Sequence, residues 1–270
     1  MTQSLMAFNR IGGAARRSLW FASLFVALTA CAETDPATPV AYQYQVEAEQ
    51  PHDPGMFTQG LIKRGERFYE SGGQYGQSRL ITYRENGRQA MREQPLADRY
   101  FAEGLTELNG KLYLLTWREQ TLLVFDADTL EPIREHRYRG EGWGLTDDGN
   151  QLIRTDGSDQ LYFHNADSFE VERQVTVTEN GKALPRLNEL EYINGAVWAN
   201  IWYANRLVRI DPDNGRVVGS LDLARLVKSA QPSAAGAVLN GIAYDTERNQ
   251  LWVTGKLWPT MFRLSVTPPL

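Results

Sequence analysis

The segment Phe57-Thr-Gln-Gly-Leu61 is a short phrase that returns four more times along the chain. Its counterparts are Phe101-Ala-Glu-Gly-Leu105, Glu141-Gly-Trp-Gly-Leu145, Arg186-Leu-Asn-Glu-Leu190 and Val238-Leu-Asn-Gly-Ile242. The fourth residue of the phrase falls at positions 60, 104, 144, 189 and 241, so the steps are 44, 40, 45 and 52 residues. A repeat of this length indicates a molecule built from similar structural units.

A second marker keeps the same rhythm. An apolar stretch before a polar turn ends near Tyr83, Phe125, His164, Ile210 and Leu264. The intervening segments are rich in β-branched and aromatic residues, and Asn-Gly and Asp-Gly pairs mark hairpin turns between them. Units of about four strands in 40–50 residues are typical of propeller blades. We therefore predict an all-β, five-bladed β-propeller with one short helix at 221–229; a sandwich would not explain the repeated phrase.

The composition of the 270 residues excludes several classes of protein. The chain is 42% hydrophobic, which suffices for a sizeable core and argues against disorder. One cysteine and three scattered histidines do not supply a cysteine- or histidine-based metal site, so we expect no metal and no cofactor. The net charge of −5 does not favour a nucleic-acid partner.

The N-terminal segment has the order of a secretory signal. Three arginines, Arg10, Arg16 and Arg17, precede an apolar run at 19–30 that is too short to span a bilayer. The run ends in Leu-Thr-Ala-Cys31, which resembles a bacterial lipobox. We therefore predict a lipoprotein signal peptide at 1–31, a tether at 32–44 and a single catalytic propeller domain at 45–270.

Lipidation of Cys31 would place the protein in the bacterial cell envelope. Several acyl chains anchor a protein stably, whereas one chain is marginal. By resemblance to lipoprotein sorting rules, Ala32 favours the outer membrane, on the periplasmic side. An ordinary secretory signal with an incidental cysteine is the alternative, and the Arg16-Arg17 pair is a weak sign of a twin-arginine route.

The position before the glycine of the phrase recurs once per repeat, so in a propeller it would form a ring around the central axis. The five residues at this position are Gln59, Glu103, Trp143, Asn188 and Asn240. Polar side chains that converge on a shared cavity are the usual sign of a ligand site. The alternative is that they hydrogen-bond to one another and to channel water.

Several longer motifs resemble the plant-type glutaminyl cyclase family, which also occurs in bacteria. The resemblance runs from about Tyr42 to Leu264. Besides the phrase and its extensions, it rests on Phe68-Tyr-Glu-Ser-Gly-Gly73, Leu187-Asn-Glu-Leu-Glu-Tyr192, Trp198-Ala-Asn-Ile-Trp202 and Leu239-Asn-Gly-Ile-Ala-Tyr-Asp245. The resemblance implies a five-bladed propeller that converts N-terminal glutamine to pyroglutamate, releases ammonia and uses no catalytic zinc.

The resemblance also implies roles for individual residues. It assigns acid/base catalysis to Glu70, with Glu103 as a second acid that binds the substrate amine or tunes Glu70. Lys256 is similar to the family's active-site lysine and would orient a substrate carbonyl or stabilise an oxyanion. For each residue a structural role, on the surface or in contact with a neighbouring blade, is the alternative.

The remaining candidates would bind the substrate. Gln59 and Asn188 are suited to hydrogen bonds with the glutamine amide, while Trp143 and Trp202 would wall the pocket and exclude water. Packing between blades is the alternative for the tryptophans; Trp117 and Trp258 are open to either role. The expected partner is a peptide or protein with N-terminal glutamine, and we expect a monomer.

Two other function classes stay open at this point. A non-catalytic propeller would act as a scaffold or as a peptide-binding lipoprotein of the envelope. A metal-dependent sugar-lactone hydrolase would need a cluster of acid and amide ligands, which Glu103, Asn188 and Asn240 would have to supply.

Overall fold

The computed structural model describes residues 38–85, 87, 89–232 and 234–270. The predicted signal peptide, Cys31 and the first part of the predicted tether therefore lie outside the described residues. In the described part, regular structure is strand except for one helix, α1 (Ala224–Ala230), close to the helix expected at 221–229. None of the described helical structure is long and apolar enough to cross a membrane. The all-β prediction is confirmed.

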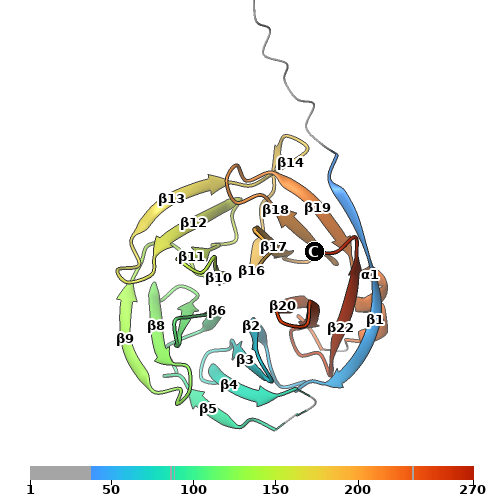
Figure 1. The fold of residues 1–270 in the computed structure, drawn as a ribbon. Coiled ribbons are helices and arrows are strands. Elements are labelled where there is room, and N and C mark those ends of the chain that lie inside the picture. Colours follow the sequence, from blue (N-terminus) through green and yellow to red (C-terminus); the bar gives the residue numbers. More distant parts are fainter. Residues whose placement is uncertain (1–37, 86, 88, 233) are drawn as a thin grey trace, which may run out of the picture. The chain divides into compact units, whose positions relative to one another are not determined.

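Three four-stranded antiparallel sheets follow one another along the chain (Figure 1). The first contains β2 (Thr58–Arg64), β3 (Arg67–Gly72), β4 (Arg79–Arg84) and β5 (Arg92–Pro95). The second contains β6 (Ala102–Leu108), β7 (Lys111–Thr116), β8 (Thr121–Asp126) and β9 (Pro132–Arg137). The third contains β10 (Leu145–Asp147), β11 (Gln151–Arg154), β12 (Gln160–Asn165) and β13 (Val171–Thr176).

The other main strands form one eight-stranded sheet. Its order is β16 (Leu187–Ile193), β17 (Ala196–Ile201), β18 (Arg206–Ile210), β19 (Val217–Asp222), β1 (Val40–Pro51), β22 (Thr260–Thr267), β21 (Gln250–Gly255) and β20 (Leu239–Asp245). Strand β1 joins its two halves, because residues 40–42 pair in parallel with β19 and residues 43–51 pair antiparallel with β22. The repeat predicts five separate four-stranded sheets; the structure has three, together with this sheet of eight.

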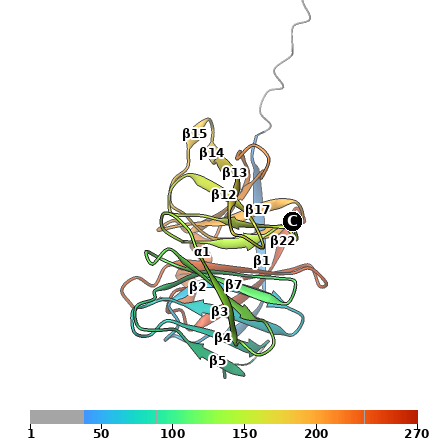
Figure 2. The ribbon, with the colours of Figure 1, turned by 90° about the vertical axis from the view of Figure 1, so that its left-hand side faces the viewer.

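A small hairpin of β14 (Thr178–Glu179) and β15 (Lys182–Ala183) extends beyond β13 (Figure 2). The first strands of the five repeated units lie nearest the centre of the view in Figure 1. They contact one another in the closed order β2, β6, β10, β16, β20 and back to β2. The repeated phrase therefore places its side chains around one central axis.

Close approach of these inner strands explains the glycine of the repeated phrase. A Cβ on Gly60 would lie 2.4 Å from the backbone nitrogen of Leu105. A Cβ on Gly144 would lie 1.9 Å from the carbonyl oxygen of Asn188. Glu189 takes this position in the fourth unit, where its buried carboxylate accepts backbone hydrogen bonds from two other inner strands. The glycine therefore allows the inner strands to pack closely, and the side chain of the residue before it faces the axis.

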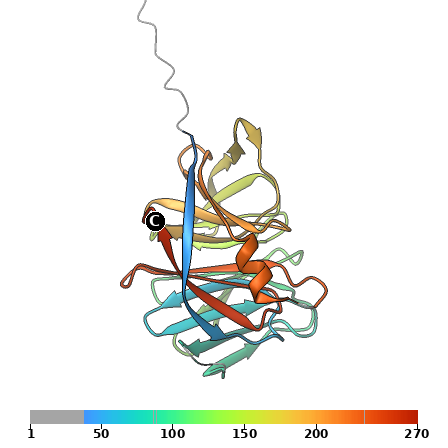
Figure 3. The same ribbon diagram turned by 90° about the vertical axis from the view of Figure 1, so that its right-hand side faces the viewer.

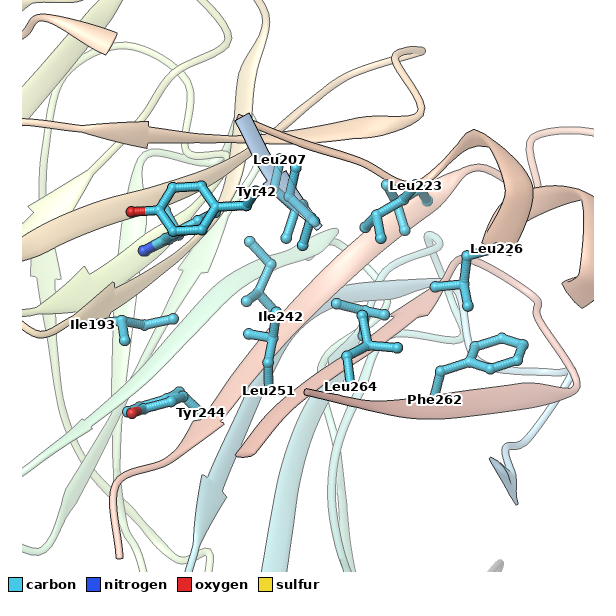
Figure 4. Close-up of a cluster of buried hydrophobic side chains, with 14 of the residues drawn as sticks. Tyr42, Ile193, Leu207, Leu223, Leu226, Ile242, Tyr244, Leu251, Phe262 and Leu264 are labelled. Carbon is cyan, nitrogen blue, oxygen red and sulfur yellow. The ribbon is translucent and has the colours of Figure 1, made fainter. Parts of the chain in front are cut away.

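Apolar side chains between neighbouring sheets form the core. Figure 4 shows the cluster at which α1 meets the eight-stranded sheet, near β1. Tyr42, Leu226 and Phe262 are among its members. Tyr42 packs edge-on against Trp198 with the ring centres 5.0 Å apart. Figure 3 shows α1 beside β22, and both contribute residues to this cluster. Each large side chain buried in this way contributes about 1.5–3 kcal/mol.

Candidate active site

A cavity of about 260 Å³ lies where the inner strands begin. Aromatic rings make up most of its wall, and a few polar side chains point into it. Its lining residues are Phe57, Gln59, Gln74, Phe101, Glu103, Trp117, Trp143, Asn188, Trp202, Tyr203, Gly236 and Lys256. An apolar pocket with a few convergent polar groups is the usual form of a small-ligand site.

Two equivalent positions of the repeat supply most of the functional side chains. The first is the position before the glycine of the phrase, at or next to the start of an inner strand; it brings Gln59, Glu103, Trp143 and Asn188 to the cavity. The second directly follows the second strand of a unit and brings in Trp117, Trp202 and Lys256.

The second position has the same backbone geometry in different units. The backbone nitrogen of Trp117 donates to the carbonyl oxygen of Phe101 over 2.9 Å, and that of Lys256 donates to Val238 over the same distance. A shared hydrogen bond of this kind turns each side chain toward the same cavity. The sequence-predicted residues Lys256 and Trp202 therefore lie beside the phrase residues although they come from other strands.

Three polar side chains form a hydrogen-bonded row on the wall. The ammonium group of Lys256 donates to Oε1 of Gln59 over 2.6 Å. The amide nitrogen Nε2 of Gln59 donates to Oε1 of Glu103 over 3.2 Å. The Gln59 amide thus connects the only cation of the described cavity lining with its only carboxylate.

Burial changes the proton affinity of both ends of this row. Loss of solvent raises the pKa of Glu103 well above its ordinary value; Glu141 and Glu119 raise it further, whereas the charge of Lys256 acts in the opposite direction. Burial also lowers the pKa of Lys256 to about 8, although the Glu103 carboxylate opposes this shift. A carboxyl group with increased proton affinity and a lysine that titrates near neutrality therefore face one cavity, an arrangement typical of functional sites.

Asn188 presents a free acceptor in the same cavity. The residue is 2% exposed, and its side-chain oxygen Oδ1 has no hydrogen-bond partner among the described residues. A buried polar atom without a partner costs free energy, so this oxygen is available to a hydrogen-bond donor that enters the cavity. Asn240, at the equivalent position of the fifth unit, lies outside the lining and donates to the Thr58 carbonyl oxygen over 2.9 Å.

Aromatic rings hold one another in place around these polar groups. Trp143 packs edge-on against Trp202 with the ring centres 5.2 Å apart. Phe101 packs edge-on against Phe57 at 6.2 Å and against Trp117 at 5.5 Å. Such edge-to-face contacts add to the gain from burial and fix ring orientation.

Glu70, the residue to which the sequence assigns acid/base catalysis, does not line this cavity. Its fully buried carboxylate lies 3.0 Å from Nε2 of His52. It also accepts hydrogen bonds from the hydroxyls of Thr58 at 2.6 Å and Tyr83 at 2.9 Å. The family resemblance implies that Glu70 acts at the same site as the other six candidates, and this is corrected: of the seven, only Gln59, Glu103, Trp143, Asn188, Trp202 and Lys256 line the cavity.

The surroundings of His52 and Glu70 favour an ion pair. Burial opposes the charged form of His52, but the Glu70 carboxylate, the Trp258 carbonyl oxygen and the charge of Asp53 together raise the pKa of His52 above its ordinary value of 6.5. Burial likewise opposes ionisation of Glu70, yet His52, Thr58 and Tyr83 together lower the pKa of Glu70. Since Nδ1 of His52 also lies 2.7 Å from the carbonyl oxygen of Trp258, this pair ties the first unit to the loop after Lys256.

The position of Glu70 within its strand explains why it is outside the cavity. It lies in the middle of β3, three positions before Gly73, which is equivalent to Trp117, Trp202 and Lys256 of the other units but is not itself a lining residue. The backbone nitrogen of Gly73 makes the equivalent 2.9 Å bond to Phe57. A Cβ on Gly73 would lie only 2.3 Å from Cε1 of Phe101. The absence of a side chain at Gly73 therefore leaves room for the Phe101 ring.

Several lining residues are not among the candidates that the sequence predicts. Phe57 and Phe101 are the first residues of their copies of the phrase, so the repeat itself was a signal for them. Trp117, for which the sequence leaves two roles open, is also a lining residue. Gln74 and Tyr203 lie on tight turns with positive φ angles of 127° and 64°, and Gly236 on another at 82°, which no spacing in the sequence indicates.

In the described ranges, no three His, Cys, Asp or Glu side chains gather closely enough to hold an ion. The candidate ligand set Glu103, Asn188 and Asn240 is not assembled, since Asn240 bonds to backbone outside the cavity lining.

Comparison with known proteins gives consistent matches. Residues 20–266 match the family model described as glutamine cyclotransferase. A glutaminyl-peptide cyclotransferase of Arabidopsis thaliana is 37% identical over 230 residues, which cover 83% of this chain and 71% of that protein. The crystal structure of Myxococcus xanthus glutaminyl cyclase superimposes with a TM-score of 0.81 and 37% identity, covering 84% of this chain and 98% of that one.

Proposed function

Because this chain belongs to the glutamine cyclotransferase family, we infer that it is an enzyme that cyclises the N-terminal glutamine of a peptide to pyroglutamate and releases ammonia. One observation carries the assignment to this cavity. A buried carboxyl group with raised proton affinity, Glu103, lies next to a hydrogen-bonded amide and cation, Gln59 and Lys256, inside an aromatic wall. The substrate would be a peptide or protein that begins with glutamine.

The reaction makes simple demands on a protein. The α-amine attacks the side-chain amide carbon of the same residue, a carbon–nitrogen bond forms, and the bond to the amide nitrogen breaks. The attacking nitrogen loses one proton and the departing nitrogen gains one, so the products are the lactam and ammonia. Both reacting groups belong to one residue, so the enzyme has to hold a bent conformer and move one proton.

We assign the proton transfer to Glu103. A general base works best when its pKa lies near the working pH, and burial moves the pKa of Glu103 in that direction. As a carboxylate it would take the proton from the attacking amine, and as an acid it would return the proton to the leaving nitrogen. Glu70 is paired with His52 outside the cavity lining, so we give it a structural role.

Two further polar groups would bind the reacting glutamine. The free oxygen Oδ1 of Asn188 is placed to accept a hydrogen bond from the substrate amine or amide N–H. Lys256 carries positive charge at the other end of the row and would stabilise negative charge that develops on the amide oxygen. Gln59 holds Lys256 and Glu103 in register through its two hydrogen bonds.

The aromatic walls complete the site. Trp143 and Trp202 meet edge-on and would pack against the aliphatic part of the glutamine side chain. Exclusion of water strengthens the interactions of Glu103 and Lys256 with the substrate, since charges interact more strongly in a low dielectric.

We propose that this cyclisation needs no metal ion. The cavity offers a single carboxylate and neither histidine nor cysteine among its described lining residues, a donor set that is poor for zinc. Full activity after prolonged treatment with a strong zinc chelator is the expected result. Loss of activity that added zinc restores would contradict it.

We further propose that the protein is a five-bladed propeller. The eight-stranded sheet would comprise two blades, one formed by β16 to β19 and one by β20 to β22 with β1 as its outer strand. The longer antiparallel pairing of β1 with β22, compared with its short parallel contact with β19, supports this division. An experimental structure with β1 withdrawn from β22 would contradict it.

The envelope location is a proposal that rests on the sequence. Cys31 at the end of the apolar run would be lipidated after cleavage of the signal peptide, anchoring the protein on the periplasmic side of the outer membrane. Labelled palmitate should enter the wild-type protein in a bacterial host and should not enter Cys31→Ser. Equal labelling, or none in either, would favour an ordinary secreted protein.

The test of the activity is a direct assay. Purified protein is incubated with a glutamine-initiated dipeptide, and ammonia and the pyroglutamyl product are measured from pH 6 to pH 9. Equal amounts of both products are expected. Folded protein that forms neither would overturn the proposal and favour a peptide-binding role for the cavity.

A further inference from the structure

Glu141 lies behind the cavity wall and hydrogen-bonds to two of the tryptophans that form it. It lies between β9 and β10 and is not one of the lining residues. Its Oε2 atom accepts hydrogen bonds from the indole nitrogens of Trp117, at 2.8 Å, and Trp143, at 3.0 Å. An indole ring has only one hydrogen-bond donor, so both tryptophans commit that donor to one carboxylate oxygen.

The other carboxylate oxygen of Glu141, Oε1, accepts a hydrogen bond from an exposed side chain. It accepts a hydrogen bond from Nε of Arg118 over 3.2 Å, and the guanidinium group also stacks 3.7 Å from the centre of the Trp117 ring. Partial burial opposes ionisation, but the bonds from Trp143, Trp117 and Arg118 together lower the pKa of Glu141 below its ordinary value. The group is therefore an anion at neutral pH and an acceptor at both oxygens.

The two indoles belong to different parts of the wall. Trp143 packs edge-on against Trp202, and Trp117 packs edge-on against Phe101. The face of Trp143 rests on Gly157, where a Cβ would lie 2.5 Å from the ring. Glu141 therefore fixes the remaining freedom of both rings, since packing limits their tilt and the N–H bond limits their rotation.

On the basis of the proposed function, we propose that Glu141 is a positioning residue for the cyclisation. It acts through Trp117 and Trp143, which it holds at the spacing that keeps the substrate glutamine in its bent, reactive conformer. Displacement of the attacking atom by about 1 Å can lower the reaction rate on the order of 10²-fold. The spacing of the two indole rings should therefore affect the rate of cyclisation directly.

The charge of Glu141 has a second, separable consequence. The charged groups that act on Glu103 are Lys256, Glu141 and Glu119. The negative charge of Glu141 raises the pKa of Glu103, so its removal should lower that pKa. A purely structural contact would not shift the pH dependence in this direction.

The experiment compares three variants with the wild type. Glu141→Ala removes both the acceptor and the charge, whereas Glu141→Gln keeps a carbonyl oxygen for the indoles and removes only the charge. Arg118→Ala removes the exposed partner and leaves the indole bonds. Glu172→Ala is a remote control, since this exposed carboxylate also accepts two side-chain hydrogen bonds, from Asn165 and Gln151.

The first readout does not depend on activity. Tryptophan indole N–H signals are recorded by nitrogen-15 NMR in the free protein and assigned with Trp117→Phe and Trp143→Phe. Glu141→Ala should move both assigned signals, and Glu141→Gln and Glu172→Ala should leave them near their wild-type positions. Unmoved signals in Glu141→Ala would overturn the proposal even if no variant, and no wild type, releases ammonia.

The second readout is the kinetics with a glutamine-initiated dipeptide. Glu141→Ala should lower kcat/KM about tenfold or more, with Glu141→Gln between it and the wild type. Both should move the Glu103-dependent limb of the pH profile toward lower pH. Arg118→Ala and Glu172→Ala should stay within about twofold of wild type. An Arg118→Ala effect equal to that of Glu141→Ala, or an unchanged kcat/KM in folded Glu141→Ala, would contradict a role through the indoles.

Discussion

The ammonium group of Lys256 lies 2.6 Å from Oε1 of Gln59 and donates its hydrogen bond to that neutral oxygen. Its charge is therefore not neutralised by direct contact, and the nearest carboxylate on the row, Glu103, is reached only through the Gln59 amide. A buried cation that is held but not paired is free to act on a substrate oxygen.

Lys256 should determine the alkaline limb of the pH profile. Its pKa is lowered to about 8, so the positive charge is present below that pH and lost above it. The substrate amine, with a pKa of about 7.7–8.0, and the Glu103 carboxyl group must both be deprotonated for the attack, so together they limit the rate on the acid side. We expect kcat/KM for a glutamine dipeptide to reach its maximum near pH 8.

Two variants test the assignment of that limb. Lys256→Met should lower kcat by about 10²–10³-fold and abolish the alkaline limb. Lys256→Arg keeps a charge that persists above about pH 12, so any activity it retains should not decline between pH 8 and 10. An unchanged alkaline limb in both variants would assign it to another group.

Glu103 should be essential for turnover and dispensable for folding. Glu103→Gln cannot carry a proton, so we expect kcat to fall by about 10²–10⁴-fold. Burial disfavours the charged form of Glu103, so its neutral replacement should leave the melting temperature unchanged or raised. Ammonia release and thermal unfolding are measured on the same preparation, and a rate close to wild type would move the proton transfer to another group.

The repeat made part of this site readable from the sequence. A residue at a fixed place in the phrase takes a fixed place relative to the axis, so Gln59, Glu103, Trp143 and Asn188 all reach the cavity. The all-β class followed from the same pattern, and only the joining of two strand groups by β1 was unforeseen, because a pairing between distant segments leaves no periodic signal.

The location of Glu70 outside the cavity could not be predicted from the sequence. A motif match places it near the site along the chain, yet two residues of extended strand separate it from Gly73, the position equivalent to Lys256 in this unit. Its partner His52 comes from the loop after β1, and nothing in the spacing of the two residues predicts a buried ion pair. Contacts made by loops, such as those of Glu141, are hidden for the same reason.

The ion pair of Glu70 and His52 should make the stability of the protein depend on pH. The raised pKa of His52 contributes stability that is complete below its ordinary value of 6.5 and is lost as the pH rises through the folded value. The lowered pKa of Glu70 contributes stability that is complete above its ordinary value of 4.5 and is lost as the pH falls through the folded value. The pair is therefore fully effective between these two ordinary values.

Glu70→Gln tests this dependence. Removal of one partner of a buried pair costs about 3–5 kcal/mol, so the free energy of unfolding in urea should fall by that order at pH 5.5. The deficit should shrink as the pH rises and His52 loses its proton in the wild type. The kcat of the folded variant should stay close to wild type. A deficit that is the same at every pH would contradict the ion pair, and a lost kcat in folded protein would return Glu70 to the catalytic role.

Gly73 should link the packing of the first unit to the shape of the cavity. A Cβ at this position would lie 2.3 Å from Cε1 of Phe101 and 2.9 Å from the carbonyl oxygen of Ala102, so neither neighbour can be avoided. Phe101 lines the cavity and packs against Phe57 and Trp117, and its displacement would disturb the wall on that side. We expect Gly73→Ala to lower the free energy of unfolding by about 1–3 kcal/mol and to raise KM.

Gly110→Asn is the matched control for this substitution. Gly110 has a φ angle of 75° and no atom within 4 Å of an added Cβ, and asparagine tolerates the left-handed conformation better than most residues. Its stability and KM should therefore stay close to wild type. If Gly73→Ala behaved like this control, Phe101 would have to move without cost, and the aromatic wall would be softer than its edge-to-face contacts indicate.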